Sequence, residues 1–107
     1  MPLSGRFSGR GETFVGLFQP QGYSLHLTGT FIPPLPLFDV PIATIQYNDL
    51  EDFAGTYYVT PPSFVGEAQL NLKLVRAGGV ELNITGALDR TLLTKVPISG
   101  TAQWFMA

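Results

Sequence analysis

The chain contains no cysteine and few charged residues, and both absences exclude classes of function. Without cysteine it forms no disulfide, has no thiol nucleophile and cannot hold zinc or an iron–sulfur cluster through thiolates. Charged residues make up 13% of the sequence, against roughly 25% in a typical soluble domain. The formal net charge is −2, whereas a nucleic-acid-binding domain presents a basic face. We therefore expect no nucleic-acid partner.

Long apolar runs are also missing. The longest apolar stretch is interrupted by prolines and is shorter than the ~20 residues of a membrane-spanning helix, so we predict no membrane span. The segment from Met1 to Arg6 contains no apolar stretch typical of a signal peptide, which leaves the cytoplasm as the default expectation. A chain of 107 residues is expected to form a single domain, residues 1–107.

Glycine and proline are plentiful instead, with 12 and 9 copies, and the segments between them alternate apolar and polar residues with period two. This pattern predicts β-strands and no long helix. Glycine inside a strand marks a bulge, a bend or a close approach of two backbones, so we expect strongly curved strands. An apolar residue, a hydroxyl residue and a glycine follow one another at Leu3–Gly5, Phe7–Gly9, Leu27–Gly29, Ile84–Gly86 and Ile98–Gly100.

About seven or eight strands joined mostly by short turns predict an all-β fold. We expect a small antiparallel β-barrel, with a two-sheet β-sandwich as the alternative. One short helical turn is expected near residues 49–54, where Asn48 can cap its start and Gly55 can end it. The expected strands are 13–18, 23–32, 40–47, 55–60, 69–75, 79–85, 91–96 and 99–106, with 3–8 as a further candidate.

The clearest pair of strands is a hairpin within residues 69–85. Apolar residues alternate along both of its strands, so all of them can face the core together. A three-residue loop at residues 76–78, ending in a left-handed glycine, would place Leu74 opposite Val80.

Two proline-rich segments, residues 33–38 and 61–63, are predicted as loops. Both are apolar, and both would lie at the same end of a barrel whose strands run strictly up and down. Inside a folded domain such a segment is typically a stiff connection laid over the core, and the alternative is that this end contacts a second subunit or a ligand. The candidate contact residues are Leu35, Leu37, Phe38, Pro61, Pro62 and Phe64.

Groups able to carry out chemistry are sparse. His26 is the single histidine and shares a strand face with Ser24 and Thr28, which is typical of a structural role. The acidic turn at residues 48–52 lacks the alternating ligands and the glycine of a calcium loop. No nucleophile elbow and no phosphate-binding loop is present. We predict no catalytic residue, no metal site and no cofactor.

The low charge and the abundance of apolar residues predict either a covered apolar surface or a large apolar interior. We expect a non-enzymatic interaction module that forms a homo-oligomer. The alternative is a barrel that binds a small apolar or aromatic ligand in its interior, which resembles lipocalin-like barrels in architecture only. A third interpretation is an enzyme that uses carboxylates or His26, although no residue pattern positions such groups.

Overall fold

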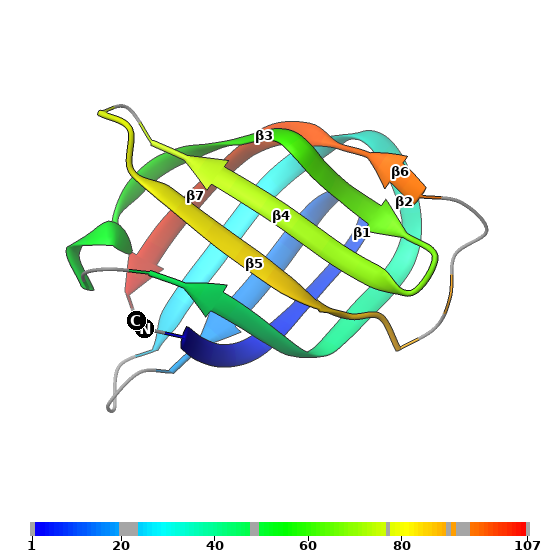
Figure 1. Ribbon diagram of the computed structural model, residues 1–107, viewed down its shortest axis with the longest axis horizontal. Helices are drawn as coiled ribbons and strands as arrows, with labels where there is room; N and C mark the ends of the chain where they lie inside the picture. Colours follow the sequence, from blue (N-terminus) through cyan, green and yellow to red (C-terminus); the bar gives the residue numbers. More distant parts are fainter. Residues whose placement is uncertain are drawn as a thin grey trace.

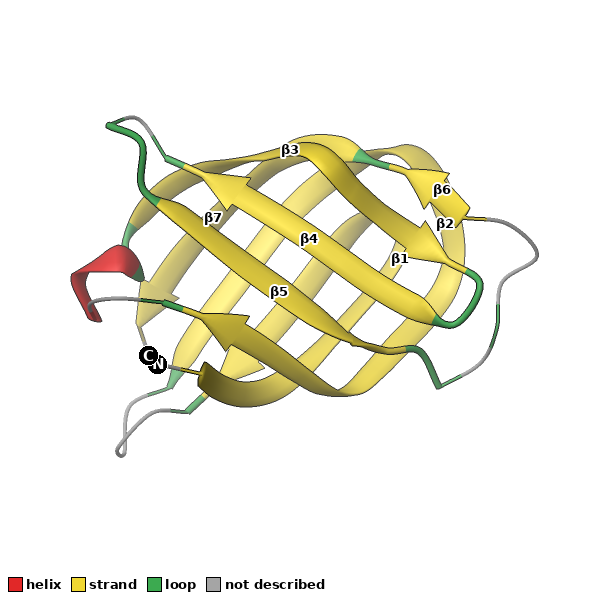
Figure 2. Cartoon of the chain, viewed as in Figure 1, coloured by secondary structure: helices red, strands yellow, loops and turns green. Residues whose placement is uncertain are grey.

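The chain folds into an all-β barrel, which confirms the predicted fold class (Figure 1). The computed structural model describes residues 2–19, 24–47, 50–76, 78–89, 91 and 95–106. Strands dominate, and the single 3₁₀ turn of the described residues projects at one end of the barrel (Figure 2). The elements are β1 (Pro2–Phe18), β2 (Leu25–Gln46), η1 (Leu50–Asp52), β3 (Gly55–Gly66), β4 (Gln69–Val75), β5 (Glu81–Ala87), β6 (Lys95–Pro97) and β7 (Ser99–Met106).

Five antiparallel strands close the barrel. They are hydrogen-bonded in the order β2–β5–β4–β3–β7, and β7 pairs back with β2. Strand β1 lies outside this ring and pairs with β2, whereas β6 lies outside it and pairs with β3. Closure leaves the ring strands without free edges, so the two outer strands hold the edges of the sheet. No helix in the described part of the chain is long and apolar enough to cross a membrane.

Strands β1 and β2 are longer than predicted, because the proline and glycine segments bend them without ending them. The segments expected as loops, residues 33–38 and 61–63, lie inside β2 and β3. All four prolines of β2 fall where its pairing with β1 is interrupted, between Thr30 and Leu35, between Leu35 and Phe38, or after Val40. Proline cannot donate to a ladder, so it fits at these interruptions and bends the strand there.

Glycines that follow a hydroxyl residue mark the closest approaches between strands, as their pattern predicted. A Cβ atom at Gly100 would lie under 3.0 Å from the carbonyl oxygen of Thr30, and one at Gly29 would meet that of Thr101 in the same way. Real Cβ atoms do not approach other atoms so closely, so only glycine fits. A Cβ at Gly5 or Gly86 would also lie under 3.0 Å from a backbone oxygen, whereas one at Gly9 would meet the Phe38 ring.

Aromatic side chains fill both ends of the barrel interior. Four phenylalanine rings from β1 and β2 pack with centroids 5.2–6.3 Å apart. At the other end, the Trp104 ring packs on Phe18 at 5.9 Å and on Phe53 at 5.0 Å. Such ring contacts stabilise the core beyond the area that they bury. The four clustered rings belong to Phe7, Phe14, Phe31 and Phe38.

The hairpin of β4 and β5 forms as predicted, but the predicted register is wrong by two residues. Leu74 pairs with Leu82 and not with Val80. Gly78 and Gly79 have positive φ angles of 100° and 90°, so both belong to the turn, which moves the loop one residue along the chain. Both registers keep the leucines on the inner face, so alternation alone could not distinguish them.

Two further elements differ in extent from the prediction. The helical turn expected near residues 49–54 is η1, and residues 48 and 49 lie outside the described residues. The strand expected at 91–96 is the short strand β6, and residues 92–94 are likewise outside them.

Tyr57 and Arg76 fasten η1 to the barrel. The buried Tyr57 hydroxyl donates a hydrogen bond to the carbonyl oxygen of Asp52 at 2.5 Å. The Arg76 guanidinium lies 5.5 Å from the centroid of the Tyr57 ring and donates hydrogen bonds to the carbonyl oxygens of Glu51 and Ala54, at 3.3 and 3.0 Å. Side chains of the barrel thus donate hydrogen bonds to carbonyl oxygens at the end of η1, as side chains commonly do at helix ends.

Replacing Gly100 with alanine is expected to destabilise the barrel by at least about 2 kcal/mol, because the new Cβ would overlap the backbone of β2. Urea unfolding monitored by tryptophan fluorescence measures the change. The exposed neighbour provides the control, since Ser99→Ala is expected to stay within about 0.5 kcal/mol of the wild type. Equal stabilities of the two variants would contradict the role of Gly100 in closure.

Stability is expected to decline as the pH rises above about 10, because burial raises the pKa of Tyr57 above its ordinary value of 10.0. The unfolded chain then releases the Tyr57 proton first, which favours unfolding until the folded state also releases it. Urea unfolding between pH about 9 and about 11 measures the decline. Tyr57→Phe should reduce this decline and the exposed Tyr58→Phe should not, so an unchanged profile in Tyr57→Phe would refute the assignment.

Candidate interaction surface

The six residues predicted as a contact surface do not share one environment. Leu35 and Phe38 are 7% and 0% exposed, because both point inward where β2 bends. They are core residues and offer no outer surface to a second subunit. Leu37 is 46% exposed, Pro61 and Pro62 are exposed, and Phe64 is half-buried under the ammonium of Lys95, which lies 4.4 Å from its ring centroid.

The two proline segments do lie at the same end of the barrel, the end away from the termini (Figure 1). The start of β7 lies between them. It pairs with β2 through Ser99 and with β3 through Gly100. Ile98, just before it, donates its N–H to the carbonyl oxygen of Ser63 at 3.1 Å. The exposed prolines of β3 and Leu37 of β2 are therefore on opposite sides of this connection.

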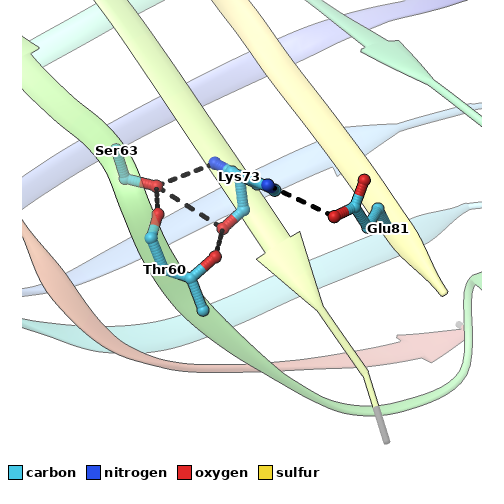
Figure 3. A network of polar contacts seen from close by, with 4 residues as sticks. All are labelled: Thr60, Ser63, Lys73 and Glu81. Atoms are coloured by element: carbon cyan, nitrogen blue, oxygen red, sulfur yellow. Dashed lines mark hydrogen bonds and ion pairs between the residues drawn. The ribbon is translucent and has the colours of Figure 1, made fainter. Parts of the chain in front are cut away.

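The prolines of β3 belong to a structural bulge. Pairing between β3 and β4 is interrupted from Thr60 to Phe64, and Ser63 inside this interruption is 3% exposed. Its hydroxyl donates to the carbonyl oxygen of Thr60 at 2.6 Å and accepts the N–H of Lys73 at 2.8 Å (Figure 3). A side-chain hydroxyl thus satisfies backbone groups that the bulge would leave without partners.

A different surface has the composition that the low charge predicted. The last part of β1, the first part of β2, β7 and the first part of β3 lie side by side. Their outward side chains form three cross-strand rows that contain no Asp, Glu, Lys or Arg, and we call these rows the uncharged face. The rows are Leu17, His26 and Phe105; Val15, Thr28, Gln103 and Thr56; and Thr13, Thr30, Thr101 and Tyr58.

The uncharged face is low in the middle and apolar at its margins. Val15, Tyr58 and Phe105 are 52%, 54% and 49% exposed, which is unusual for side chains of this size. Short threonine side chains lie between them around a shallow depression of about 160 Å³. The His26 ring stacks on Phe105 with a centroid distance of 5.1 Å and an angle of 7°. The face therefore offers apolar contacts and hydroxyl groups to a partner.

Charged side chains lie on other parts of the barrel. The ammonium of Lys73 on β4 and the carboxylate of Glu81 on β5 form an ion pair at 3.2 Å. Arg6 and Arg10 are exposed on the first part of β1. The three rows of the uncharged face thus contain no charged side chain, and Arg6 lies beside them at the margin next to Val15, Leu17 and His26.

Alternation in the sequence predicted the direction of the aromatic residues on this face. It placed one member of each adjacent aromatic pair inside the barrel and one outside. Tyr57 and Trp104 are buried and Tyr58 and Phe105 are exposed, so this prediction is confirmed. The threonine rows were missed, because they depend on pairing between strands that are far apart in the sequence.

The arrangement around His26 offers no proton-transfer partner in its own row. Its cross-strand neighbours are Leu17 and Phe105, whose side chains neither donate nor accept a proton. Across the described ranges, no three His, Asp or Glu side chains gather as a group that could hold a metal ion.

Comparison with known proteins gives no guide to function, since no protein-family model, no curated protein and no solved structure matches this chain.

Proposed function

We propose that this protein is a non-enzymatic interaction module that forms a homo-oligomer by packing its uncharged face against the same face of a second copy. The observation that carries the proposal is the absence of charged side chains from three adjacent rows on four strand segments. A surface that stays in water normally intersperses charges among its polar groups. When a partner covers a face, any charged side chain on it must be removed from water, which costs free energy. A face without charged side chains avoids this cost.

The second copy is favoured because an isologous interface must be complementary to itself. Around a two-fold axis, a charged side chain comes close to its own symmetry mate, and like charges placed together cost several kcal/mol. The three rows of the uncharged face contain no Asp, Glu, Lys or Arg side chain. The exposed Tyr58 and Phe105 rings provide anchors that can fill the depression of the other copy.

Short side chains in the middle of the face also suit the packing of one sheet on another. Two sheets stack about 10 Å apart when their inner side chains interdigitate. Thr28, Thr30 and Thr101 keep the centre low, so the larger marginal side chains of one copy fit between those of the other.

The competing interpretation places a small apolar ligand inside the barrel. The phenylalanine cluster occupies the end of that interior where β1 and β2 bend, and its ring centroids lie 5.2–6.3 Å apart. Trp104 and its neighbours occupy the other end. This packing favours the interaction module, which needs no cavity and accounts for the low charge through its outer surface.

Thr101→Arg tests the proposal, because it introduces a charge at the depression of the uncharged face, and the exposed Thr101 side chain does not point into the core. We expect the wild type to self-associate in sedimentation velocity over a concentration series. The variant should associate at least about a hundredfold more weakly, because two like charges would be buried together.

The matched control is Asn83→Arg, which adds the same charge at an exposed position of β5, outside the uncharged face. Circular dichroism confirms that both variants are folded. A wild type that stays monomeric throughout the series would overturn the proposal. Equal weakening by both variants would show that total charge matters and the location of the charge does not.

A further inference from the structure

Strand β1 folds back on itself, and its two arms leave a groove on the outside of the barrel. The first arm, residues 2–9, pairs with the second half of β2. The last arm, residues 13–18, pairs with the first half of β2. Within the described residues, no backbone pairing joins one arm to the other. The arms touch where Gly5 meets the backbone of Leu17, and a groove of about 240 Å³ opens beside this contact.

The groove combines an apolar base with three polar residues that can each donate a hydrogen bond. Phe7 and Gly16, which are both buried, lie at its base, and Val15 and Leu17 form an apolar side. A Cβ at Gly16 would lie 3.3 Å from the Phe7 ring and 3.5 Å from Leu27, so this position faces the core beneath the groove. The polar lining residues are Arg6, Ser8 and His26, and none of the lining residues is acidic.

Among the described residues, Arg6 has no carboxylate partner. The ion pair of the described residues joins Lys73 to Glu81 on the β4–β5 hairpin, away from β1. A guanidinium beside an apolar surface recognises carboxylates in particular, because its planar N–H groups match the two carboxylate oxygens. His26 and Ser8 add further donors at the same groove.

We propose that the groove between the arms of β1 binds a small molecule that has an apolar body and one carboxylate. The carboxylate is held by the Arg6 guanidinium, with Ser8 and His26 as further hydrogen-bond donors. The apolar body lies on Val15, Leu17 and the Phe7 ring. The volume suits a molecule about as large as one aromatic amino-acid side chain. The groove shares Val15, Leu17 and His26 with the uncharged face, so the ligand and a second copy would compete for these residues.

A titration with phenylacetate, followed by two-dimensional ¹H–¹⁵N NMR, tests the proposal. We expect saturable shifts of the amides of Arg6, Ser8, Gly16 and His26 at about millimolar concentrations, as is usual for so small a ligand. Phenylacetamide has the same apolar body without the charge, and should bind at least about tenfold more weakly. Acetate, which lacks the apolar body, should also bind more weakly.

Two arginine variants distinguish a specific site from general attraction of anions. Arg6→Gln should weaken phenylacetate binding at least about tenfold, because it removes the bidentate partner. Arg10→Gln removes the same charge from the same strand outside the groove, and should leave binding unchanged. Both variants are first checked for the wild-type pattern of amide signals, which shows that the fold is intact.

Three results would overturn the proposal: no saturable shift with phenylacetate, equal binding of phenylacetate and phenylacetamide, or equal losses in the Arg6 and Arg10 variants. The association state is measured by sedimentation on the same samples. A monomer that binds phenylacetate would support the groove while refuting the homo-oligomer. If the wild type is an oligomer, the titration is repeated on the Thr101→Arg variant, in which Val15, Leu17 and His26 are uncovered, and no binding by that variant would refute the groove.

Discussion

Contact of backbone against backbone at glycine is the constraint on which closure of the barrel depends. Strand β7 fits between β2 and β3 because Gly100 meets the carbonyl of Thr30 and Gly29 meets the carbonyl of Thr101. These contacts are reciprocal, and they flank the row of the uncharged face that crosses from Thr30 on β2 to Thr101 on β7. A side chain at either glycine would push the strands apart, open the ring and split the face. The interior packing and the outer surface thus depend on the same two positions.

Bending of the outer strands follows from a second constraint, namely that proline cannot join a ladder. The prolines of β2 lie at interruptions of its pairing with β1, and those of β3 lie in the bulge that Ser63 stabilises. Each bend turns one long strand into two arms that face one another across the core. The groove between the arms of β1 is a consequence of this folding, because two arms of one strand meet without a ladder between them.

The sequence predicted the features that depend on neighbours along the chain. Alternation gave the β4–β5 hairpin and the directions of Tyr58 and Phe105, and the hydroxyl–glycine units gave the close approaches. The prediction from sequence failed where pairing between distant segments determines the structure. Prolines were interpreted as loops, since nothing local indicates that β1 supports β2 through the bend. Leu35 was therefore assigned to the surface although it lies in the core. The threonine rows need the pairing of β7 with β2 and β3, which joins residues far apart in the sequence.

The adjacent aromatic pairs connect the exposed rings of the uncharged face to the core. Trp104 packs among rings inside the barrel while its neighbour Phe105 stands outside against His26. Tyr57 is likewise held by Asp52 and Arg76, and Tyr58 projects from the next position. Each exposed ring is thus attached to a residue that the core immobilises. A face built on strands in this way loses little conformational entropy on binding, so even modest apolar contacts leave a net gain in affinity.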